Sequence, residues 1–212
     1  MESLTAPKQT RQSLIEAAIH LFGHRGFAET STRALAARAG TNIASIAYHF
    51  GGKAGLHAAS AREVAARIGA ALALSDHVPP DTPAEAAARL ETMLRRFVNF
   101  LVAAPEAADM AAFMLRELTD PGEVADLIYN EFLEPRHRML CGLWGLATGR
   151  PPESETVKLG VFAMLGQVLY FRIGQPYVLR RTGWAEVGPD EASRIADLLA
   201  GNLHAMIERH RT

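Results

Sequence analysis

Apolar residues recur with helical spacing along almost the whole chain, and this periodicity constrains the fold more than any other feature of the sequence. Near the N-terminus, Leu14, Ala18, Leu21 and Phe22 lie on one side of a helix that Gly26 can end. Later segments repeat the pattern between breaks rich in proline and glycine, and no run alternates with the period of two that a half-buried strand needs. The sequence therefore predicts an all-α fold.

The composition is that of an ordinary globular protein. The 212 residues are 49% hydrophobic and carry a formal net charge of −1. No hydrophobic run approaches the ~20 residues of a membrane span, and the first residues lack the apolar centre of a signal peptide. A single cysteine, Cys141, rules out an intramolecular disulfide framework. We therefore expect a cytoplasmic protein without a membrane segment.

The near-zero net charge hides an asymmetry between two parts of the chain. Residues 1–57 contain six basic and three acidic side chains, a net charge of +3, whereas residues 58–212 contain 16 basic and 20 acidic side chains, a net charge of −4. A basic segment on an acidic body favours a polyanionic partner for the basic segment only. We place a domain boundary after His57, which separates an N-terminal domain at 1–57 from a larger helical domain at 58–212.

The N-terminal domain has the pattern of three short helices. After the first helix, Ser31 can cap a second helix and Gly40 can end it in the left-handed conformation. After a turn of about three residues, Asn42 is a good N-cap for a third helix, IASIAYHF. Three helices in some fifty residues, the last two joined by a turn containing glycine, are typical of a helix-turn-helix unit.

The third helix has one face made of small side chains. On a helical wheel, Ile46 and Phe50 share the face that can pack inside the domain, whereas Ile43, Ala44 and Ala47 lie away from it. Small side chains on an exposed helix permit close approach to the major groove of DNA, where thymine methyl groups offer apolar partners. The alternative is that this helix is simply buried in a bundle.

A lysine follows the third helix after two glycines. Gly51 and Gly52 supply a tight connection, and Lys53 is suited to meet a DNA phosphate together with the N-terminal amides of the next helix. The same stretch lacks the first glycine of a nucleotide-binding phosphate loop, so no nucleotide site is predicted.

The segment STRALAARAGTNIASIAYHFGGKAGL resembles the DNA-binding segment of the TetR (tetracycline repressor) family of transcriptional regulators. The resemblance covers about fifty residues, and it implies a helix-turn-helix head, a helical ligand-binding body, a homodimer and release from the operator by a small molecule. It implies backbone and base contacts for Thr32 and Arg33, base contacts for Ile43, Ala44 and Ser45, and phosphate contacts for Tyr48, His49 and Lys53.

This sequence departs from the family pattern at two positions of the third helix. Ile43 occupies a position where a polar or basic residue is common, and Ala47 one where an aromatic residue is common. The helix therefore has few hydrogen-bonding groups for base edges, so Arg33, Ser45, methyl contacts and DNA shape must provide more of the specificity.

The C-terminal part is similar to the TetR subgroup typified by the cefoperazone- and chloramphenicol-sensitivity regulator, through MLRELTDP, NEFLEPRHRML and GQVLYFRIGQPYVLR. Pro135 and Pro176 interrupt helical patterns and can open a cavity by bending helices. Polar or aromatic residues near these bends are candidate effector ligands: Arg116, Glu117, Tyr129, His137, Cys141, Trp144, Gln167, Tyr170 and Arg172. The alternative is that each is an ordinary core or surface residue.

The last two helices are predicted to form a homodimer interface. One stripe contains Ile195, Leu198, Leu199, Leu203 and Met206, and a second contains Leu159, Phe162, Ala163, Gly166 and Tyr170. Two such pairs related by a twofold axis would make a four-helix bundle. The alternative is that both stripes face the chain's own core.

No enzymatic activity, cofactor or metal is predicted. His20 and His24 have a spacing that can chelate a metal, but the sequence offers no evident third ligand and no HExxH pattern. The chain is predicted to be a ligand-responsive, sequence-specific regulator, a repressor that binds a double-stranded DNA operator and an effector of unknown identity. Two alternatives remain open: a helical small-molecule-binding protein or enzyme with a structural helix-turn-helix, and a DNA-binding protein that responds to no ligand.

Overall fold

The computed structural model describes residues 6–72, 79–104, 107–122 and 124–211. All regular elements within these ranges are helices, and none is a strand, which confirms the predicted all-α fold. The chain divides into two compact units. The first comprises Met1–Ile68 and Ala108–Phe132, and the second comprises Gly69–Ala107 and Leu133–Thr212.

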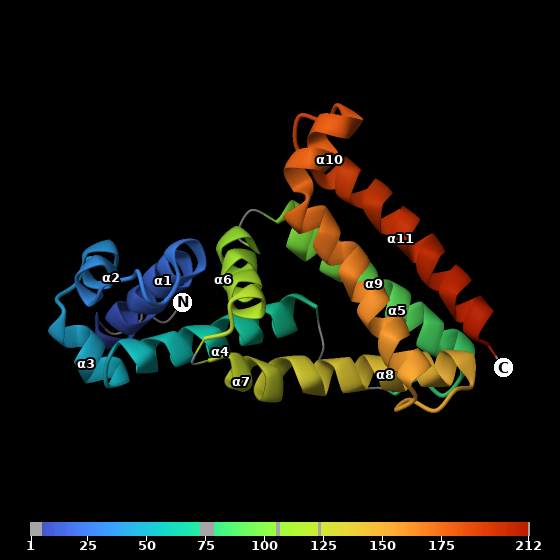
Figure 1. Ribbon diagram of the computed structural model, residues 1–212, viewed down its shortest axis with the longest axis horizontal. Helices are drawn as coiled ribbons and strands as arrows, with labels where there is room; N and C mark the ends of the chain where they lie inside the picture. Colours follow the sequence, from blue (N-terminus) through green and yellow to red (C-terminus); the bar gives the residue numbers. More distant parts are fainter. Residues whose placement is uncertain (1–5, 73–78, 105–106, 123, 212) are drawn as a thin grey trace. The chain divides into compact units, whose positions relative to one another are not determined.

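The first unit contains the predicted three-helix arrangement. Helices α1 (Ala6–Arg25), α2 (Thr32–Arg38) and α3 (Ala44–Phe50) pack against one another, as Figure 1 shows in blue. The same unit holds most of α4 (Lys53–Ala71), nearly all of α6 (Ala107–Thr119) and the short α7 (Ala125–Ile128). Apolar side chains fill its centre, and the largest fully buried ones include Leu14, Phe22, Leu35, Ile46 and Leu56.

The predicted helix caps are confirmed. The Ser31 hydroxyl accepts a hydrogen bond from the backbone N–H of Ala34 at 3.1 Å, and so begins α2. Gly40 follows α2 with a φ of +64°, and the amides of Gly40 and Thr41 donate to the carbonyls of Ala37 and Ala36. This is the paired hydrogen-bond pattern of a Schellman motif, which needs a left-handed residue.

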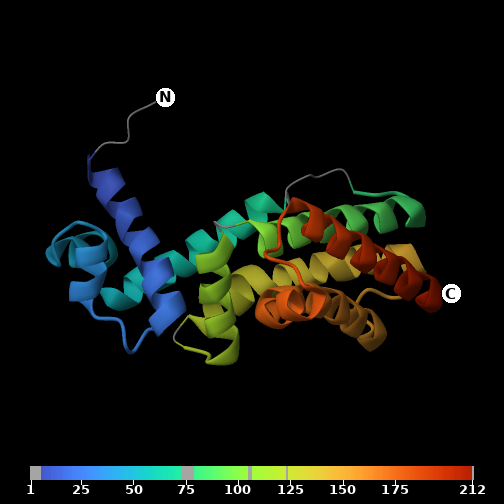
Figure 2. The same cartoon turned by 90° about the horizontal axis from the view of Figure 1, so that it is seen from above.

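The second unit is a helical bundle. Helices α5 (Pro83–Val98), α8 (Glu134–Thr148), α9 (Glu155–Ile173) and α11 (Pro189–His210) pack against one another, and Figures 1 and 2 show them side by side. The π-helical segment η1 (Asn99–Ala103) continues α5, and α10 (Gln175–Thr182) follows α9. Buried side chains from all four long helices fill the bundle, among them Leu90, Trp144, Val161 and Leu203.

The two prolines lie in different settings, and only Pro176 stands at a break between two helices. Pro135 lies inside a helical run that continues from α7 through the π-helical segment η2 (Tyr129–Leu133) into α8, since the backbone at Tyr129 and Leu133 stays helical. Pro176 lies in the first turn of α10, and the chain leaves α9 at Gly174. Since proline has no N–H to donate, Pro176 fits the first turn of a new helix. The bend expected at Pro176 is therefore a break between α9 and α10, whereas the helical run is kept at Pro135.

One continuous helix of the described part, α9, is long and apolar enough to cross a membrane by length and composition, with a mean hydropathy of 1.3. The prediction that no run approaches this length does not hold for α9. Only 28% of this apolar stretch of α9 is buried within the chain. Much of this apolar surface is therefore open to a partner. The described part of the chain resumes at residue 79, and α5 begins at Pro83.

Candidate functional site

The outward face of α3 is open. Ile43 is 47% exposed and Tyr48 is 83% exposed, and Ala44 and Ala47 are exposed as well. Ile46 points the other way and is 1% exposed, because it packs in the core of the first unit. The alternative of a helix buried in a bundle is therefore wrong for α3. A narrow helix with short, exposed side chains has the shape that a major groove admits.

Polar side chains hold the start of α3 in place. The Asn42 side-chain oxygen accepts hydrogen bonds from the Ser45 amide at 2.9 Å and from the Ser45 hydroxyl at 3.1 Å. The Ser45 and Thr41 hydroxyls lie 3.0 Å apart. The predicted capping role of Asn42 is confirmed, although the regular part of the helix begins two residues later. Ser45 is half-buried and already engaged within the chain, so it has limited freedom to donate to a base.

The connection from α3 to α4 is tight. Gly51 and Gly52 have φ values of +74° and +138°, which side-chain-bearing residues adopt only with strain. Lys53 is the first residue of α4, and its ammonium lies 4.1 Å from the centre of the Phe27 ring. A cation–π contact of this kind orients the lysine at the start of the helix. The charge and the free amides of the first turn together form a site suited to a phosphate.

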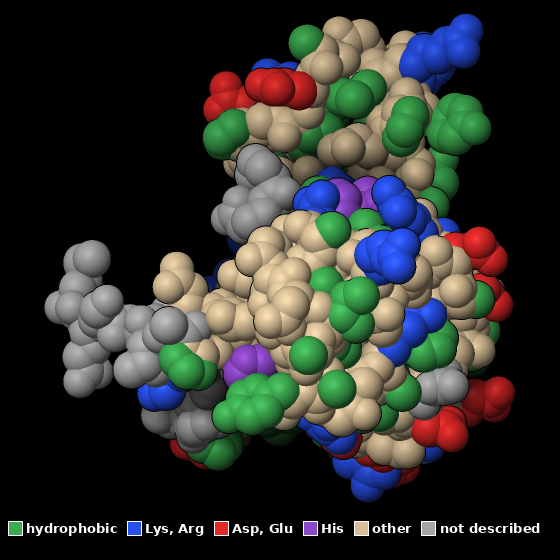
Figure 3. Space-filling model, turned by 90° about the vertical axis from the view of Figure 1, so that its left-hand side faces the viewer, with side chains coloured by type: hydrophobic (Ala, Val, Ile, Leu, Met, Phe, Trp, Pro, Cys, Tyr) green, Lys and Arg blue, Asp and Glu red, His purple; other side chains and the backbone are tan. Residues whose placement is uncertain are grey.

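The start of α2 lies in the same helix-turn-helix unit. Thr32 is half-buried and Arg33 is exposed, directly after the Ser31 cap. His49, on the last turn of α3, is half-buried with its ring centre 4.8 Å from that of Tyr48. Figure 3 shows one face of the molecule, on which Lys and Arg side chains form separate clusters between hydrophobic side chains. DNA contacts of such a surface would alternate between phosphate and apolar groups.

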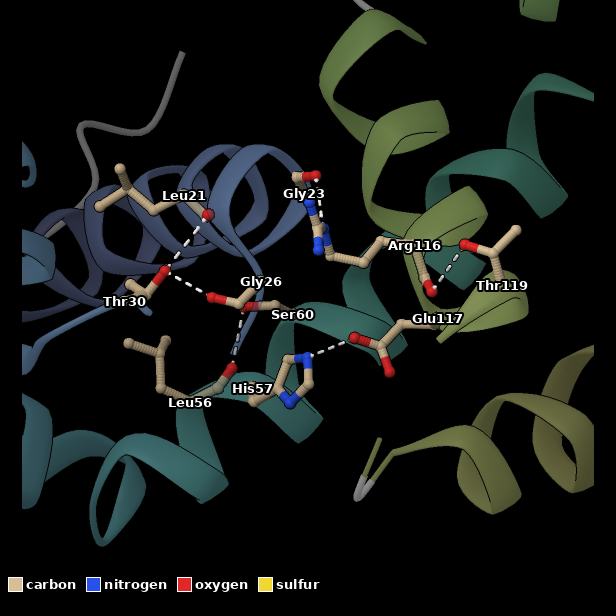
Figure 4. A network of polar contacts seen from close by, with 10 residues as sticks. All are labelled: Leu21, Gly23, Gly26, Thr30, Leu56, His57, Ser60, Arg116, Glu117 and Thr119. Atoms are coloured by element: carbon tan, nitrogen blue, oxygen red, sulfur yellow. Dashed lines mark hydrogen bonds and ion pairs between the residues drawn. The ribbon is translucent and has the colours of Figure 1, made fainter. Parts of the chain in front are cut away.

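A buried polar pair links α4 to α6 in the first unit. The His57 Nε2 and Glu117 Oε1 atoms lie 3.0 Å apart, and the two side chains are 0% and 5% exposed. Figure 4 shows Glu117 pointing towards the imidazole of His57. The aromatic rings of Phe22, Phe27 and Phe113 surround that imidazole with ring centres 4.6 to 5.5 Å away. Sequence reasoning missed this pair because its members are sixty residues apart.

A second contact joins α6 to the end of α1. The Arg116 Nε donates to the Gly23 carbonyl at 3.2 Å (Figure 4). The same guanidinium also reaches the His24 carbonyl at 3.5 Å. A cation at these positions satisfies the carbonyls that a helix leaves free at its C-terminus. A Cβ at Gly23 would lie 2.8 Å from the Phe113 backbone nitrogen, so the two helices cross with their backbones in contact.

The nine candidate effector residues fall into both units. Arg116, Glu117 and the exposed Tyr129 belong to the first unit. The others belong to the second unit: His137, Cys141 and Trp144 on α8, and Gln167, Tyr170 and Arg172 on α9. Some of these six residues contact side chains that lie beside them in the fold. In the described part of the chain, no set of contacts joins all six.

Of the three candidates on α8, Cys141 and Trp144 are buried and His137 is half-buried. The Cys141 Sγ lies 3.6 Å from the His137 Nδ1, and the His137 ring stacks on Phe162 with centres 4.0 Å apart. Burial, followed by the charge of Glu153, raises the pKa of the Cys141 thiol above its ordinary value. Trp144 is fully buried, and among the described residues its indole N–H has no hydrogen-bond partner. A buried donor without a partner is rare, so it marks this part of α8 as a candidate place for a polar group of a ligand or a water.

On α9, the candidates lie at the surface of the bundle. Gln167 accepts a hydrogen bond from the side-chain nitrogen of Asn202 on α11 at 2.8 Å, so it helps to join these two helices. Tyr170 is 60% exposed, and Arg172 is half-buried in the last turn of α9. Their contacts with an effector stay a prediction.

Comparisons with known proteins match both halves of the chain. Residues 14–59 match the family model described as bacterial regulatory proteins of the tetR family. Residues 86–209 match the model described as the C-terminal domain of the HTH-type transcriptional dual regulator CecR. The second match alone covers more than half of the chain.

Individual relatives agree with these models. The HTH-type transcriptional dual regulator CecR of Shigella flexneri is 29% identical over 211 residues, which cover 95% of this chain and 92% of the relative. A TetR-like transcriptional regulator from Rhodococcus sp. RHA1 shares the fold with a TM-score of 0.67, at 22% identity, over 96% of this chain and 99% of the other.

A further solved structure, AibR in complex with isovaleryl coenzyme A and operator DNA, matches with a TM-score of 0.66 at 19% identity, over 91% of this chain and 97% of the other. At this identity the likeness concerns the fold, while the two family models carry the assignment. The chain therefore belongs to the TetR family of transcriptional regulators, in the group that shares the C-terminal domain of CecR.

Proposed function

We propose that this transcriptional regulator is a cytoplasmic homodimer that binds one operator through α2, α3 and the start of α4, and leaves it when a small molecule binds. The observation that carries the proposal is the open face of α3, with Tyr48 and Ile43 exposed above a fully buried Ile46. A helix-turn-helix whose third helix served only as structure would have no need to keep this apolar face in solvent. Residues 1–57 form the DNA-binding part and residues 58–212 the effector-binding and dimerisation part.

The contacts with DNA divide into two kinds. Arg33 and the face of Ile43, Ala44 and Ser45 meet base edges, with thymine methyls as apolar partners. Phosphate contacts come from a second set, which comprises Thr32, Tyr48, His49 and Lys53. Because Ser45 is engaged by the Asn42 cap, Arg33 and DNA shape contribute most of the discrimination.

This division predicts different effects for two substitutions. Arg33→Ala should lower affinity for the operator by about 1–3 kcal/mol and relax base preference, whereas Lys53→Ala should weaken binding to all sequences alike and reduce the salt slope by about 1. The measurement is fluorescence anisotropy on DNA flanking the protein's own coding region and on scrambled DNA, across a salt series. Arg181→Ala, an exposed charge on α10, serves as the control for loss of one positive charge. Equal losses of selectivity in the Arg33 and Lys53 variants would contradict the division.

The proposed homodimer uses α9 and the outer face of α11. Four large apolar side chains on these helices are between 57% and 60% exposed: Leu159, Phe162, Tyr170 and Leu198. Other residues of the predicted α11 stripe do not face solvent: Ile195, Leu199 and Leu203 are buried in the chain's own bundle. An apolar surface of this kind favours an interface between identical helices.

Phe162→Glu should convert the dimer to a monomer at micromolar concentration, because two like charges would face an apolar interface. Light scattering during gel filtration measures the mass directly. Leu118→Glu, which places the same charge on an exposed residue of α6, should leave the dimer intact. A monomeric wild-type chain, or equal dissociation of both variants, would argue against this interface.

An effector bound within the helical body is the second part of the proposal. The buried indole N–H of Trp144, which has no hydrogen-bond partner in the described part of the chain and lies on the same helix as Cys141 and His137, offers a polar anchor for such a ligand. AibR was solved with both a coenzyme A thioester and operator DNA, which supports this coupling by similarity of fold. A ligand shifts the operator equilibrium only if it binds the two states with different affinities.

Because the relative CecR is named a dual regulator, the reporter assay should score both repression and activation in cells with and without the gene. Compounds that shift operator binding should be recovered unchanged. Turnover of a compound that leaves operator binding unaffected would favour the alternative of a helical enzyme or carrier.

A further inference from the structure

Two histidines of α1 meet one carboxylate of α6 within the first unit. The His20 Nδ1 lies 2.9 Å from the Asp109 Oδ2, and the His24 Nε2 lies 2.9 Å from the Asp109 Oδ1. Each of the three residues offers one potential ligand atom, and these three atoms all lie within 4.8 Å of one another. The sequence shows only the two histidines one helical turn apart, because Asp109 comes 85 residues after His24.

The three side chains are held in this arrangement by the helices that carry them. Their backbones cross in contact, since a Cβ at Gly23 would lie 3.2 Å from the Asp109 carbonyl oxygen. Arg116 of α6 also stabilises the contact with α1, because its guanidinium donates to the Gly23 and His24 carbonyls. The histidine rings lie with centres 4.6 Å apart. The ligand groups are therefore brought together by packing that does not depend on a metal.

The site is open to ions from solvent. The side chains of His20, His24 and Asp109 are 30%, 51% and 42% exposed, so no desolvated cavity has to open for entry. Burial raises the pKa of Asp109, but the hydrogen bonds from His24 and His20 outweigh it and leave the pKa below the ordinary value. The carboxylate of Glu16, one turn before His20, interacts electrostatically with Asp109, but its ion pair with Arg67 offsets its charge.

Two imidazoles and one carboxylate are a donor set for divalent transition metals, and in particular for zinc with one open position. Zinc bonds of about 2.0–2.2 Å place neighbouring ligand atoms roughly 3.3 Å apart in a tetrahedron. The present nitrogen–oxygen separations of 2.9 Å need small rotations of the side chains to reach that spacing. The ligands would be the Nδ1 of His20, the Nε2 of His24 and an oxygen of Asp109.

We propose that His20, His24 and Asp109 form a binding site for a divalent transition metal that links α1 to α6. The ion replaces the two hydrogen bonds to Asp109 with coordinate bonds and leaves at least one position for water. Because the ligands come from two helices, a bound ion stabilises their contact by mass action. The proposal does not depend on operator binding, so it is tested on the protein without DNA.

Isothermal titration of the chelator-treated full chain with zinc chloride tests the site directly. We expect one ion per chain, and a loss of affinity of about 10–100-fold or more in Asp109→Asn and in His24→Gln. His204→Gln is the matched control, since His204 forms an exposed pair with Glu91 at 2.8 Å on the second unit. That variant should bind zinc as the wild type does.

Cobalt provides a second readout that a purely structural role would not change. Co²⁺ added to the wild type should give visible absorption bands of a low-coordinate site, and these bands should be absent in His24→Gln. Thermal unfolding of each variant without metal establishes that it is folded. The proposal is overturned if the wild type takes up no zinc, if Asp109→Asn and His204→Gln bind zinc equally well, or if the cobalt bands persist in His24→Gln.

Discussion

Replacing Glu117 by alanine is expected to lower the free energy of unfolding of the first unit by about 3–5 kcal/mol, because it leaves the buried imidazole of His57 without its partner. The two side chains are almost completely inaccessible, and the nearest neighbours of the His57 ring are aromatic. Water therefore has no ready path to replace the lost hydrogen bond. A buried polar group that loses its partner carries its full desolvation cost.

Denaturant unfolding followed by circular dichroism measures this effect. Glu131→Ala is the matched control, because it removes a carboxylate paired with Arg62 on the surface of the same unit. We expect no measurable change for that exposed pair. Glu117→Gln should recover much of the stability, since the amide can still pair with His57. A loss in Glu117→Ala no larger than that in Glu131→Ala would mean that the buried pair contributes little.

Gly55→Ala is expected to have an effect of similar size, through the contact between α3 and α4. A Cβ at this position would lie 1.8 Å from the carbonyl oxygen of Phe50, the last residue of α3. The clash is with backbone, which cannot rotate away, so α3 or the first turn of α4 must shift. We expect a loss of stability of about 3 kcal/mol or more, at the upper end of what overpacking costs. Operator affinity should fall by at least about tenfold, because α3 moves relative to the phosphate site at Lys53.

Gly142→Ala is the control for this substitution. Gly142 lies inside α8, is exposed, and has open space around the position of a Cβ. Alanine there should raise stability by about 0.5–1 kcal/mol, as expected from helix propensity alone. Unfolding curves and operator titrations of both variants make the comparison. An unchanged operator affinity in a folded Gly55→Ala protein would contradict the role assigned to the close approach.

Local structure in the N-terminal part could be predicted in detail from the sequence. The hydrogen bonds at the helix ends join residues no more than five positions apart, at Ser31, Gly40 and Asn42. They therefore depend little on how distant parts of the chain pack. The face of α3 could be predicted for the same reason, since Tyr48 follows Ile46 by two residues and helical periodicity places it on the opposite side of the helix. The assignment of base and phosphate contacts to these residues stays a prediction.

The longer helices were harder to predict. The interruption at Gly174 and Pro176 was interpreted as a bend within one helix, whereas it separates α9 from α10. A proline is compatible with a bend within one helix and with a break between two helices. The packing of the turn that follows decides between the two. The stripes on α9 and α11 were equally ambiguous. An apolar stripe has the same sequence pattern whether it faces its own core, as Leu203 does, or solvent, as Phe162 does.

The sequence by itself determined the helical fold, the helix-turn-helix and its caps, because each rests on periodicity and on hydrogen bonds between near neighbours. Only the tertiary structure decided which distant polar groups meet. Glu117 pairs with His57, Arg116 reaches the end of α1, and Asp109 joins His20 and His24. All three contacts come from α6, whose position is set by its packing against α1 and α4. No pattern along the chain encodes that packing, since it depends on the shapes of side chains more than fifty residues away.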